Sequence, residues 1–94
     1  MPNRSKQKGD RFEREIVREA EGIGLKAYRH FLSRSPISDV VDIVVAGRQV
    51  QCKKEATGFK RIREWMEGVD AVIVGSDRER PLVVVRLEDW LKLL

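Results

Sequence analysis

Residues 42–53 read D-I-V-V-A-G-R-Q-V-Q-C-K, with an apolar run on each side of a Gly-Arg pair. This pattern predicts a β-hairpin, because β-branched residues favour strands and glycine favours a tight turn. If the turn is centred on Gly47-Arg48, Asp42 lies opposite Lys53. Charged side chains are rare on strands that a small domain covers. The presence of Asp42 and Lys53 in these strands therefore requires a structural or functional explanation.

Alternation along each strand sorts the hairpin into two faces. The apolar side chains share a core face: Val41, Ile43, Val45, Val50 and Cys52. The polar side chains converge on the opposite face: Asp42, Gln51, Lys53 and, if the strand continues, Glu55. A cross-strand ion pair, which contributes at most about 1 kcal/mol, accounts for Asp42 and Lys53 but not for Gln51.

The segments around the hairpin predict helices and strands in the order α-β-β-β-α-β-β-α, an α/β (α+β) fold of helices on a central mixed sheet. Asp10 is expected to cap the first helix, and Gly22 and Gly24 to end it. The expected helices are 10–21, 58–67 and 87–94. The expected strands are 25–31, 40–46, 49–54, 71–75 and 82–86.

Length and composition predict a mobile basic arm over residues 1–8 and a single domain over residues 9–94. The single cysteine excludes an intramolecular disulfide, and no apolar run approaches the roughly 18 residues of a membrane span. We therefore expect a cytoplasmic protein with no membrane partner. Residues 1–38 carry nine Lys/Arg against five Asp/Glu. This excess favours nucleic acid as partner, or else a solvated surface.

The first predicted helix carries one charged side chain inside its apolar arc. At about 100° per residue, Glu13 falls between Phe12 and Val17, while the other charged residues of the helix fall outside. An inward carboxylate needs a partner, because burying an unpaired charge is costly. One alternative is a structural ion pair of Glu13 with Lys53 or Arg29.

Two inward carboxylates, Glu13 and Asp42, beside the Gln51 amide and Lys53 make a site of hard oxygen ligands. Such ligands suit Mg²⁺ or Mn²⁺ and do not suit zinc. A divalent ion there can polarise a phosphodiester, with the lysine offsetting developing charge.

A glutamate in the first helix, an aspartate in a strand and a lysine across a hairpin resemble the PD-(D/E)xK nuclease superfamily. The stretches K-G-D-R-F-E-R-E-I-V, G-L-K-A-Y-R, V-D-I-V and Q-V-Q-C-K resemble archaeal-type Holliday junction resolvases. The likeness covers roughly residues 8–86. It implies a restriction-endonuclease-like α-β-β-β-α-β core, with Lys53 as catalytic lysine and no small-molecule cofactor. The metal ligands it implies are Glu13, Asp42, Gln51, the Cys52 backbone carbonyl and, with a continuing strand, Glu55.

Several basic side chains are predicted to contact DNA phosphates, and Arg29 matches a basic residue that ends the second element of those resolvases. The predicted contacts are Lys6, Lys8, Arg11, Arg29, His30, Arg34, Lys54 and Lys60. Each has a plain alternative as part of a solvated surface.

The chain departs from the family pattern at two positions. Gln51 stands where the family usually has Glu, and its neutral amide should lower ion affinity. Val41 stands where the motif has Pro, which mainly shapes the backbone. Asp39 is a second candidate for the acidic position. These departures keep open a catalytically silent module that binds nucleic acid without cutting it.

The expected function is that of a Mg²⁺- or Mn²⁺-dependent DNA endonuclease that hydrolyses phosphodiesters in a four-way junction. A homodimer is expected, because a four-way junction has two-fold symmetry. Its interface is predicted at the strands 71–75 and 82–86 and the helix of Trp90. The alternatives are a superfamily nuclease with another DNA substrate, the silent binding module, and an interaction domain with an internal ion-pair cluster.

Overall fold

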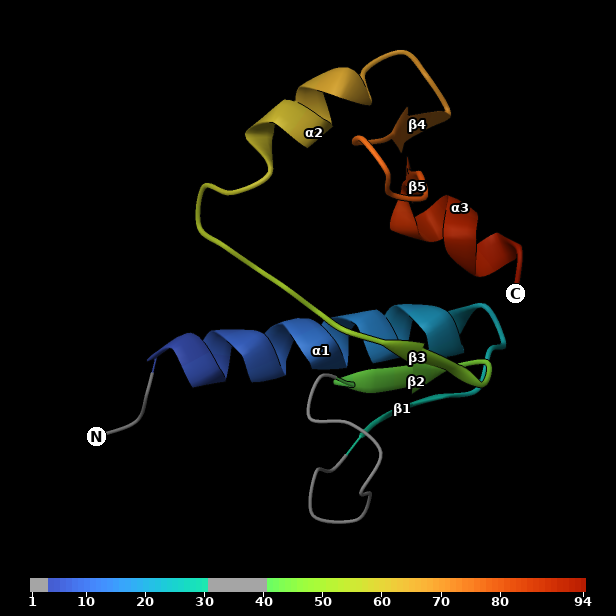
Figure 1. Ribbon diagram of the computed structural model, residues 1–94. Helices are drawn as coiled ribbons and strands as arrows, with labels where there is room; N and C mark the ends of the chain where they lie inside the picture. Colours follow the sequence, from blue (N-terminus) through green and yellow to red (C-terminus); the bar gives the residue numbers. More distant parts are fainter. Residues whose placement is uncertain (1–3, 31–40) are drawn as a thin grey trace. The chain divides into compact units, whose positions relative to one another are not determined.

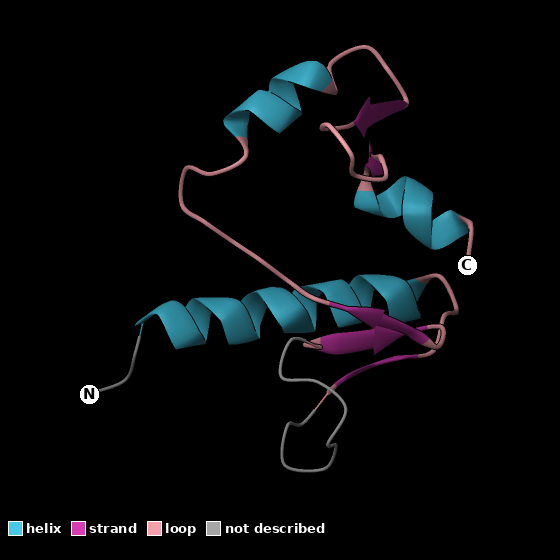
Figure 2. Ribbon diagram, viewed as in Figure 1, coloured by secondary structure: helices cyan, strands magenta, loops and turns pink. Residues whose placement is uncertain are grey.

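A computed structural model describes the backbone of residues 4–30 and 41–94 and the side chains of residues 9–30 and 41–94. The element order α-β-β-β-α-β-β-α is the predicted one, and the mixed α+β class is confirmed (Figures 1 and 2). We predicted a single domain over residues 9–94. Contacts divide the chain into two compact units, residues 1–54 and 55–94.

The first unit is a long helix packed on a three-stranded antiparallel sheet (Figure 1). The helix is α1 (Arg4–Gly22), and the strands are β1 (Ala27–Arg29), β2 (Ile43–Val45) and β3 (Arg48–Val50). The sheet has the order β1-β2-β3. Its core holds Ile16 and Ala20 of α1 with Ala27, Ile43 and Val45 of the strands, all buried. This face of the sheet therefore points to α1.

The β2–β3 hairpin turns one residue earlier than predicted. Val45 pairs with Arg48, so the turn is Ala46-Gly47 and not Gly47-Arg48. Both turn residues have positive φ, 48° and 82°, which is the geometry of a type I′ hairpin turn. The predicted pairing of Asp42 with Lys53 is therefore wrong: the ladder ends with Ile43 opposite Val50, and the Asp42 N–H donates to the Val50 carbonyl. The shift moves each partner by two positions, so the two predicted faces are unchanged.

Helix α1 begins at Arg4, and Asp10 therefore lies within the helix and does not cap it. Lysine and glutamine are good helix formers, and this explains why the helix extends through much of the expected basic arm. Its C-terminus is as predicted, because Gly24 adopts a left-handed φ of 88° and donates to the Glu21 carbonyl.

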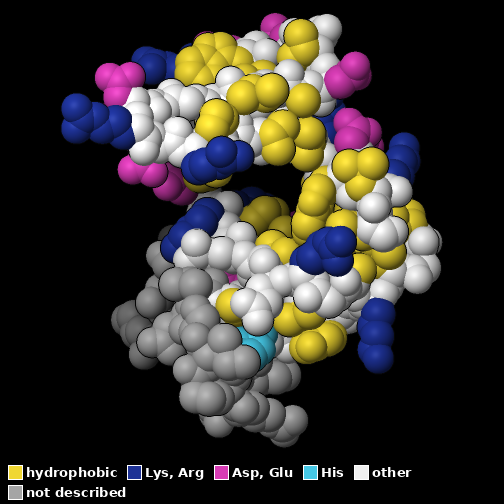
Figure 3. Space-filling model, turned by 45° about the vertical axis from the view of Figure 1, so that its right-hand side comes forward, with side chains coloured by type: hydrophobic (Ala, Val, Ile, Leu, Met, Phe, Trp, Pro, Cys, Tyr) yellow, Lys and Arg dark blue, Asp and Glu magenta, His cyan; other side chains and the backbone are white. Residues whose placement is uncertain are grey.

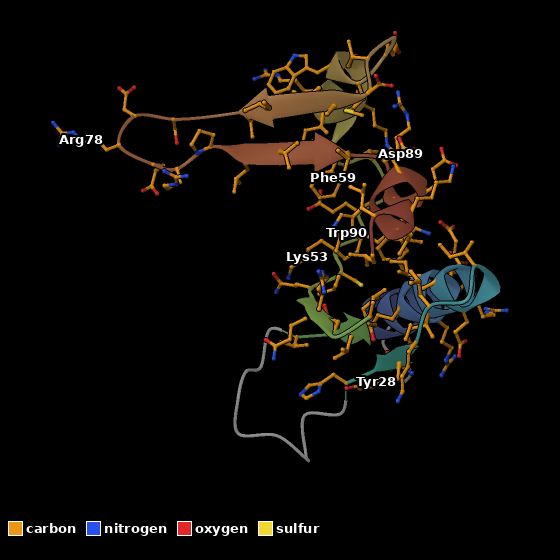
Figure 4. The ribbon with its side chains drawn as sticks, turned by 90° about the vertical axis from the view of Figure 1, so that its right-hand side faces the viewer. Tyr28, Lys53, Phe59, Arg78, Asp89 and Trp90 are labelled. Carbon is orange, nitrogen blue, oxygen red and sulfur yellow. The ribbon has the colours of Figure 1, made fainter. Side chains whose placement is uncertain are left out.

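The second unit contains two short helices and a two-stranded antiparallel hairpin (Figure 4). Its elements are α2 (Lys60–Trp65), β4 (Ala71–Val74), β5 (Leu82–Val85) and α3 (Leu87–Lys92). The Arg86 guanidinium donates to the carbonyls of Met66 and Val69 at 2.8 and 2.9 Å. This joins the end of β5 to the turn that follows α2, where the Met66 carbonyl also accepts a hydrogen bond from the Val69 N–H.

The described strands form two separate antiparallel sheets, one in each unit, where we predicted one mixed sheet. The predicted Arg34 and Asp39 lie outside the described residues, as do the side chains of Lys6 and Lys8. Within the described part of the chain, no helix combines the length and apolarity needed to cross a membrane.

Candidate functional site

Arg29 joins two carboxylates of α1 on the core face of the first unit. The register places Arg29 opposite Ile43, so its side chain points to α1. Its Nε donates to Glu13 Oε1 at 3.1 Å, and its Nη2 donates to Asp10 Oδ1 at 2.9 Å. The predicted inward orientation of Glu13 is confirmed, and so is the alternative that Arg29 is its ion-pair partner. Asp10 is a member of this cluster that the sequence did not reveal.

Asp42 is held by backbone bonds to both neighbouring strands. Its N–H donates to the Val50 carbonyl, and its own carbonyl accepts from the His30 N–H, each at 2.9 Å. Its carboxylate then accepts a hydrogen bond from the Cys52 N–H through Oδ2 at 2.7 Å. The carboxylate thus continues the pairing of the hairpin arms beyond β3, and its position is set by the sheet.

The pKa of the Cys52 thiol is raised from its ordinary value of 9.0 to about 11, mainly by burial and further by the negative charges of Asp42 and Glu13. Glu13 comes from α1 and Asp42 directly precedes β2, and no hydrogen bond or ion pair among the described side chains joins the two carboxylates.

Each of the two carboxylates is held through one oxygen. Among the described residues, Glu13 Oε2 and Asp42 Oδ1 accept no hydrogen bond. No three His, Cys, Asp or Glu side chains within the described ranges form a group that could hold a metal ion. Mg²⁺ needs fewer, since it keeps several waters and is usually bound through one or two carboxylates. Carboxylate and neutral oxygens, such as those of Glu13, Asp42, Gln51 and the Cys52 carbonyl, are the ligand types that this ion prefers.

The other predicted site residues, Gln51, Lys53 and Glu55, lie beyond the end of β3. Gln51 and Lys53 follow the end of β3 with exposed side chains. Lys53 is labelled in Figure 4. Among the described ion pairs, none joins Lys53 to Asp42, so the predicted cross-strand pair does not form. Glu55 was predicted to join this face if the strand continued, but β3 ends at Val50. Glu55 opens the second unit, where its side chain lies against Gly58.

Three of the residues predicted to contact DNA phosphates, Lys54, His30 and Arg29, lie in the first unit. The Lys54 Nζ lies 5.1 Å from the centre of the Phe12 ring, a cation–π distance. His30 lies beside Asp42, and its Nε2 is buried without a partner among the described residues. Arg29 is occupied by its two carboxylates, so the phosphate contact predicted for it would require breaking these ion pairs.

The outer face of α1 carries a stripe of arginines, of which only Arg11 was predicted to bind DNA. Arg11, Arg14 and Arg18 are all exposed. At about 100° per residue they lie within about 60° of one another, on the side opposite Ile16 and Ala20. None of the three belongs to an ion pair among the described side chains. The spacing of these arginines, three and four residues apart, would have allowed the stripe to be predicted from the sequence.

The raised thiol pKa predicts slow alkylation of Cys52. At pH 8 a thiol with a pKa of about 11 is only about one-thousandth thiolate, so iodoacetamide should react about a hundredfold more slowly with the folded chain than with the urea-denatured one. Glu13→Gln and Asp42→Asn should each accelerate the reaction, and Glu15→Gln on the exposed face of α1 should not. Equal rates for all variants would show that neither carboxylate faces Cys52.

The same shift gives the sign of one stability effect. The folded chain keeps the Cys52 proton up to about pH 11, whereas the unfolded chain loses it near pH 9. Stability from this group is therefore present below pH 9 and lost as the pH rises through 11.

Comparison of the chain with family models, with curated proteins and with solved structures finds no match.

Proposed function

We propose that the protein is a Mg²⁺- or Mn²⁺-dependent DNA endonuclease of PD-(D/E)xK type that hydrolyses phosphodiesters in branched DNA, with a four-way junction as substrate. The element order of the chain supports a restriction-endonuclease-like α-β-β-β-α-β core as part of this proposal. The observation that carries the proposal is that the Glu13 side chain points inward from α1 while the Asp42 carboxylate is fixed at the end of the hairpin by the Cys52 N–H.

The proposal gives each candidate site residue a role. Glu13 Oε2 and Asp42 Oδ1 would hold the ion, and Gln51 and the Cys52 carbonyl would add neutral oxygens. When bound, the ion supplies a Lewis acid that offsets charge on the scissile phosphate. Lys53, which is exposed after the end of β3, would orient the attacking water and stabilise the charge that develops as the P–O ester bond breaks.

The arginine stripe of α1, defined by Arg11, Arg14 and Arg18, supports DNA as the partner. The apolar face of α1 is buried against the sheet, so this helix offers an acidic partner only its charged outer face. A membrane surface would additionally require an apolar face. Guanidinium groups without carboxylate partners bind phosphates with little rearrangement.

Replacing all three stripe arginines by Gln should lower the salt dependence of DNA binding. Each lost phosphate contact reduces the slope of log K against log[salt] by about 0.9, so the expected loss is about 2 to 3. The matched control replaces Arg63, Arg80 and Lys92, which are also exposed, by Gln. Equal slopes for both triple variants would assign the effect to net charge and not to the stripe.

We propose a homodimer that forms through the β4–β5 hairpin, as the sequence predicted. Ile73 and Val83 pair directly across the hairpin and are 75% and 62% exposed. Apolar side chains are visible at the surface of the second unit (Figure 3). Light scattering should give the mass of a dimer at micromolar concentration, and Ile73→Lys with Val83→Glu should give a monomer. A wild-type monomer with and without junction DNA would contradict this.

The experiment that tests the function is cleavage of an end-labelled four-way junction with Mg²⁺ or Mn²⁺, beside a linear duplex of the same sequence and an EDTA control. Metal-dependent products from the junction but not from the duplex support the proposal. Cleavage of both substrates would indicate a nuclease of broader specificity. Binding without cleavage under any divalent ion would favour the silent module, whose basis is the neutral Gln51 and the pairing of Glu13 with Arg29.

A further inference from the structure

The face of the first unit's sheet that points away from α1 carries an exposed aromatic ring. Alternation along β1 puts Ala27 and Arg29 on the core face and Tyr28 on the opposite, outer face. Tyr28 is 51% exposed, and among the described residues of the first unit it is the only exposed aromatic side chain. Because α1 packs on the core face, the surface of this ring is not used in the core of the unit.

The strand register extends the outer face from Tyr28 into a row across all three strands. Tyr28 pairs with Val44, and Val44 pairs with Gln49. Neighbouring strands lie about 4.8 Å apart, so Tyr28 and Gln49 are separated by about 10 Å, with Val44 between them. Val44 is half-buried and Gln49 is exposed. The row therefore offers a ring at one side, an apolar floor in the middle and an amide that can donate and accept at the other side.

The charges of the sheet favour an anionic ligand. Residues 25–30 and 41–54 contain a single carboxylate, that of Asp42, which already accepts a hydrogen bond from the Cys52 N–H. The same segments carry four exposed cationic side chains that form no ion pair among the described residues: Lys26, Arg48, Lys53 and Lys54. Lys26 continues the pairing of β1 with β2, because its carbonyl accepts the Ala46 N–H, and it lies on the same face as Tyr28. An open ring beside excess positive charge suits a polyanion that carries flat aromatic groups.

We infer that the row of Tyr28, Val44 and Gln49 is a platform on which an unpaired base of single-stranded DNA stacks. Aromatic rings on exposed sheet faces bind single strands by stacking, and this binding tolerates any sequence because every base has a π face. A base on the Tyr28 ring would extend over Val44, with the Gln49 amide at its edge. The faces of a base within a duplex are covered by its neighbours, so a duplex should bind here more weakly. The platform goes beyond the proposed cleavage function, because it needs no metal ion and breaks no bond.

The test is fluorescence anisotropy of an end-labelled oligothymidylate titrated with the full chain in EDTA, so that metal binding plays no part. Tyr28→Ala and Tyr28→Val should each weaken binding about tenfold, within the range found when a stacking ring is removed. Valine favours a strand as tyrosine does, so its effect is not a loss of β1. Tyr28→Phe keeps the ring and should bind within about twofold of wild type.

Two further variants separate stacking on this face from exposed rings in general and from charge. Trp65→Ala removes a ring that is 49% exposed in the second unit and should bind as wild type does. Lys26→Gln should lower the slope of log K against log[salt] by about 0.7, the value for one phosphate contact of a single strand. Tyr28→Val should leave this slope unchanged, since stacking releases no counterion. Circular dichroism of each variant gives the folded fraction to which affinities are referred.

The outcomes divide as follows. A tenfold loss for Tyr28→Val with full binding by Trp65→Ala supports the platform. Equal binding by wild type and Tyr28→Val overturns it, because the ring is then not needed, and an equal loss for Trp65→Ala overturns it as well. Tighter binding of the matched duplex than of the single strand would exclude a site for unpaired bases. If wild type binds no oligothymidylate, the inference fails alone, because junction cleavage is measured separately.

Discussion

Replacing Asp42 by Asn should reduce junction cleavage by about a thousandfold or more, while binding of the junction changes by less than about threefold. A metal contributes several kcal/mol to stabilising a phosphoryl transition state, and each 1.36 kcal/mol is a factor of ten in rate. Asn keeps an oxygen that can accept the Cys52 N–H, so the end of the hairpin should be preserved. Binding persists because it depends mainly on phosphate contacts from basic side chains.

The measurement pairs single-turnover cleavage with gel-shift binding of the same labelled junction. Asp77→Asn, in the exposed turn between β4 and β5, is the matched control and should leave both unchanged. Lys53→Ala should also abolish cleavage, with some loss of affinity because a positive charge is removed. Full cleavage by Asp42→Asn would exclude Asp42 as a ligand.

Replacing Gln51 by Glu should increase cleavage about tenfold at limiting Mg²⁺ and bring activity to its plateau at lower Mg²⁺. Residue 51 directly follows β3 and Asp42 directly precedes β2 at the same end of the hairpin, and an anionic oxygen binds a hard cation better than an amide oxygen does. At saturating Mg²⁺ the two proteins should cut at similar rates, because the added charge acts on ion affinity.

Glu55→Gln is the comparison that decides which position supplies the further oxygen. The Glu55 side chain lies against Gly58 in the second unit, so its loss should leave the Mg²⁺ dependence unchanged. If Glu55→Gln is as damaging as Asp42→Asn and Gln51→Glu is neutral or harmful, Glu55 and not residue 51 completes the site. If wild type and Gln51→Glu both fail to cut any DNA with any divalent ion, the silent binding module is the better account.

The inward position of Glu13 could be predicted because helical phase is a local property of the chain. The two faces of the hairpin were also predictable. Side chains alternate between the faces, so a register error of two positions leaves every residue on the face that was predicted for it. The turn itself was misplaced. Ala46 adopts a φ of 48°, a conformation that is unfavourable for alanine, and so nothing in its side chain marks it as a turn residue.

The cluster around Arg29 could be predicted only in part. An ion pair of Glu13 with Arg29 was one of two open alternatives, and the choice depends on strand register. Asp10 was interpreted as a helix cap because the helix was expected to begin there. Once α1 begins at Arg4, Asp10 lies three residues before Glu13 on the same face, and Arg29 reaches both.

The most direct test of the central claim, that Glu13 and Asp42 form one cation site, is calorimetric titration of Mn²⁺ into wild type and into the Glu13→Gln/Asp42→Asn double variant. We predict one Mn²⁺ per chain in wild type and no detectable binding in the double variant, whose circular dichroism should match that of wild type. Undiminished Mn²⁺ binding by the folded double variant, or no binding by wild type, would contradict the account.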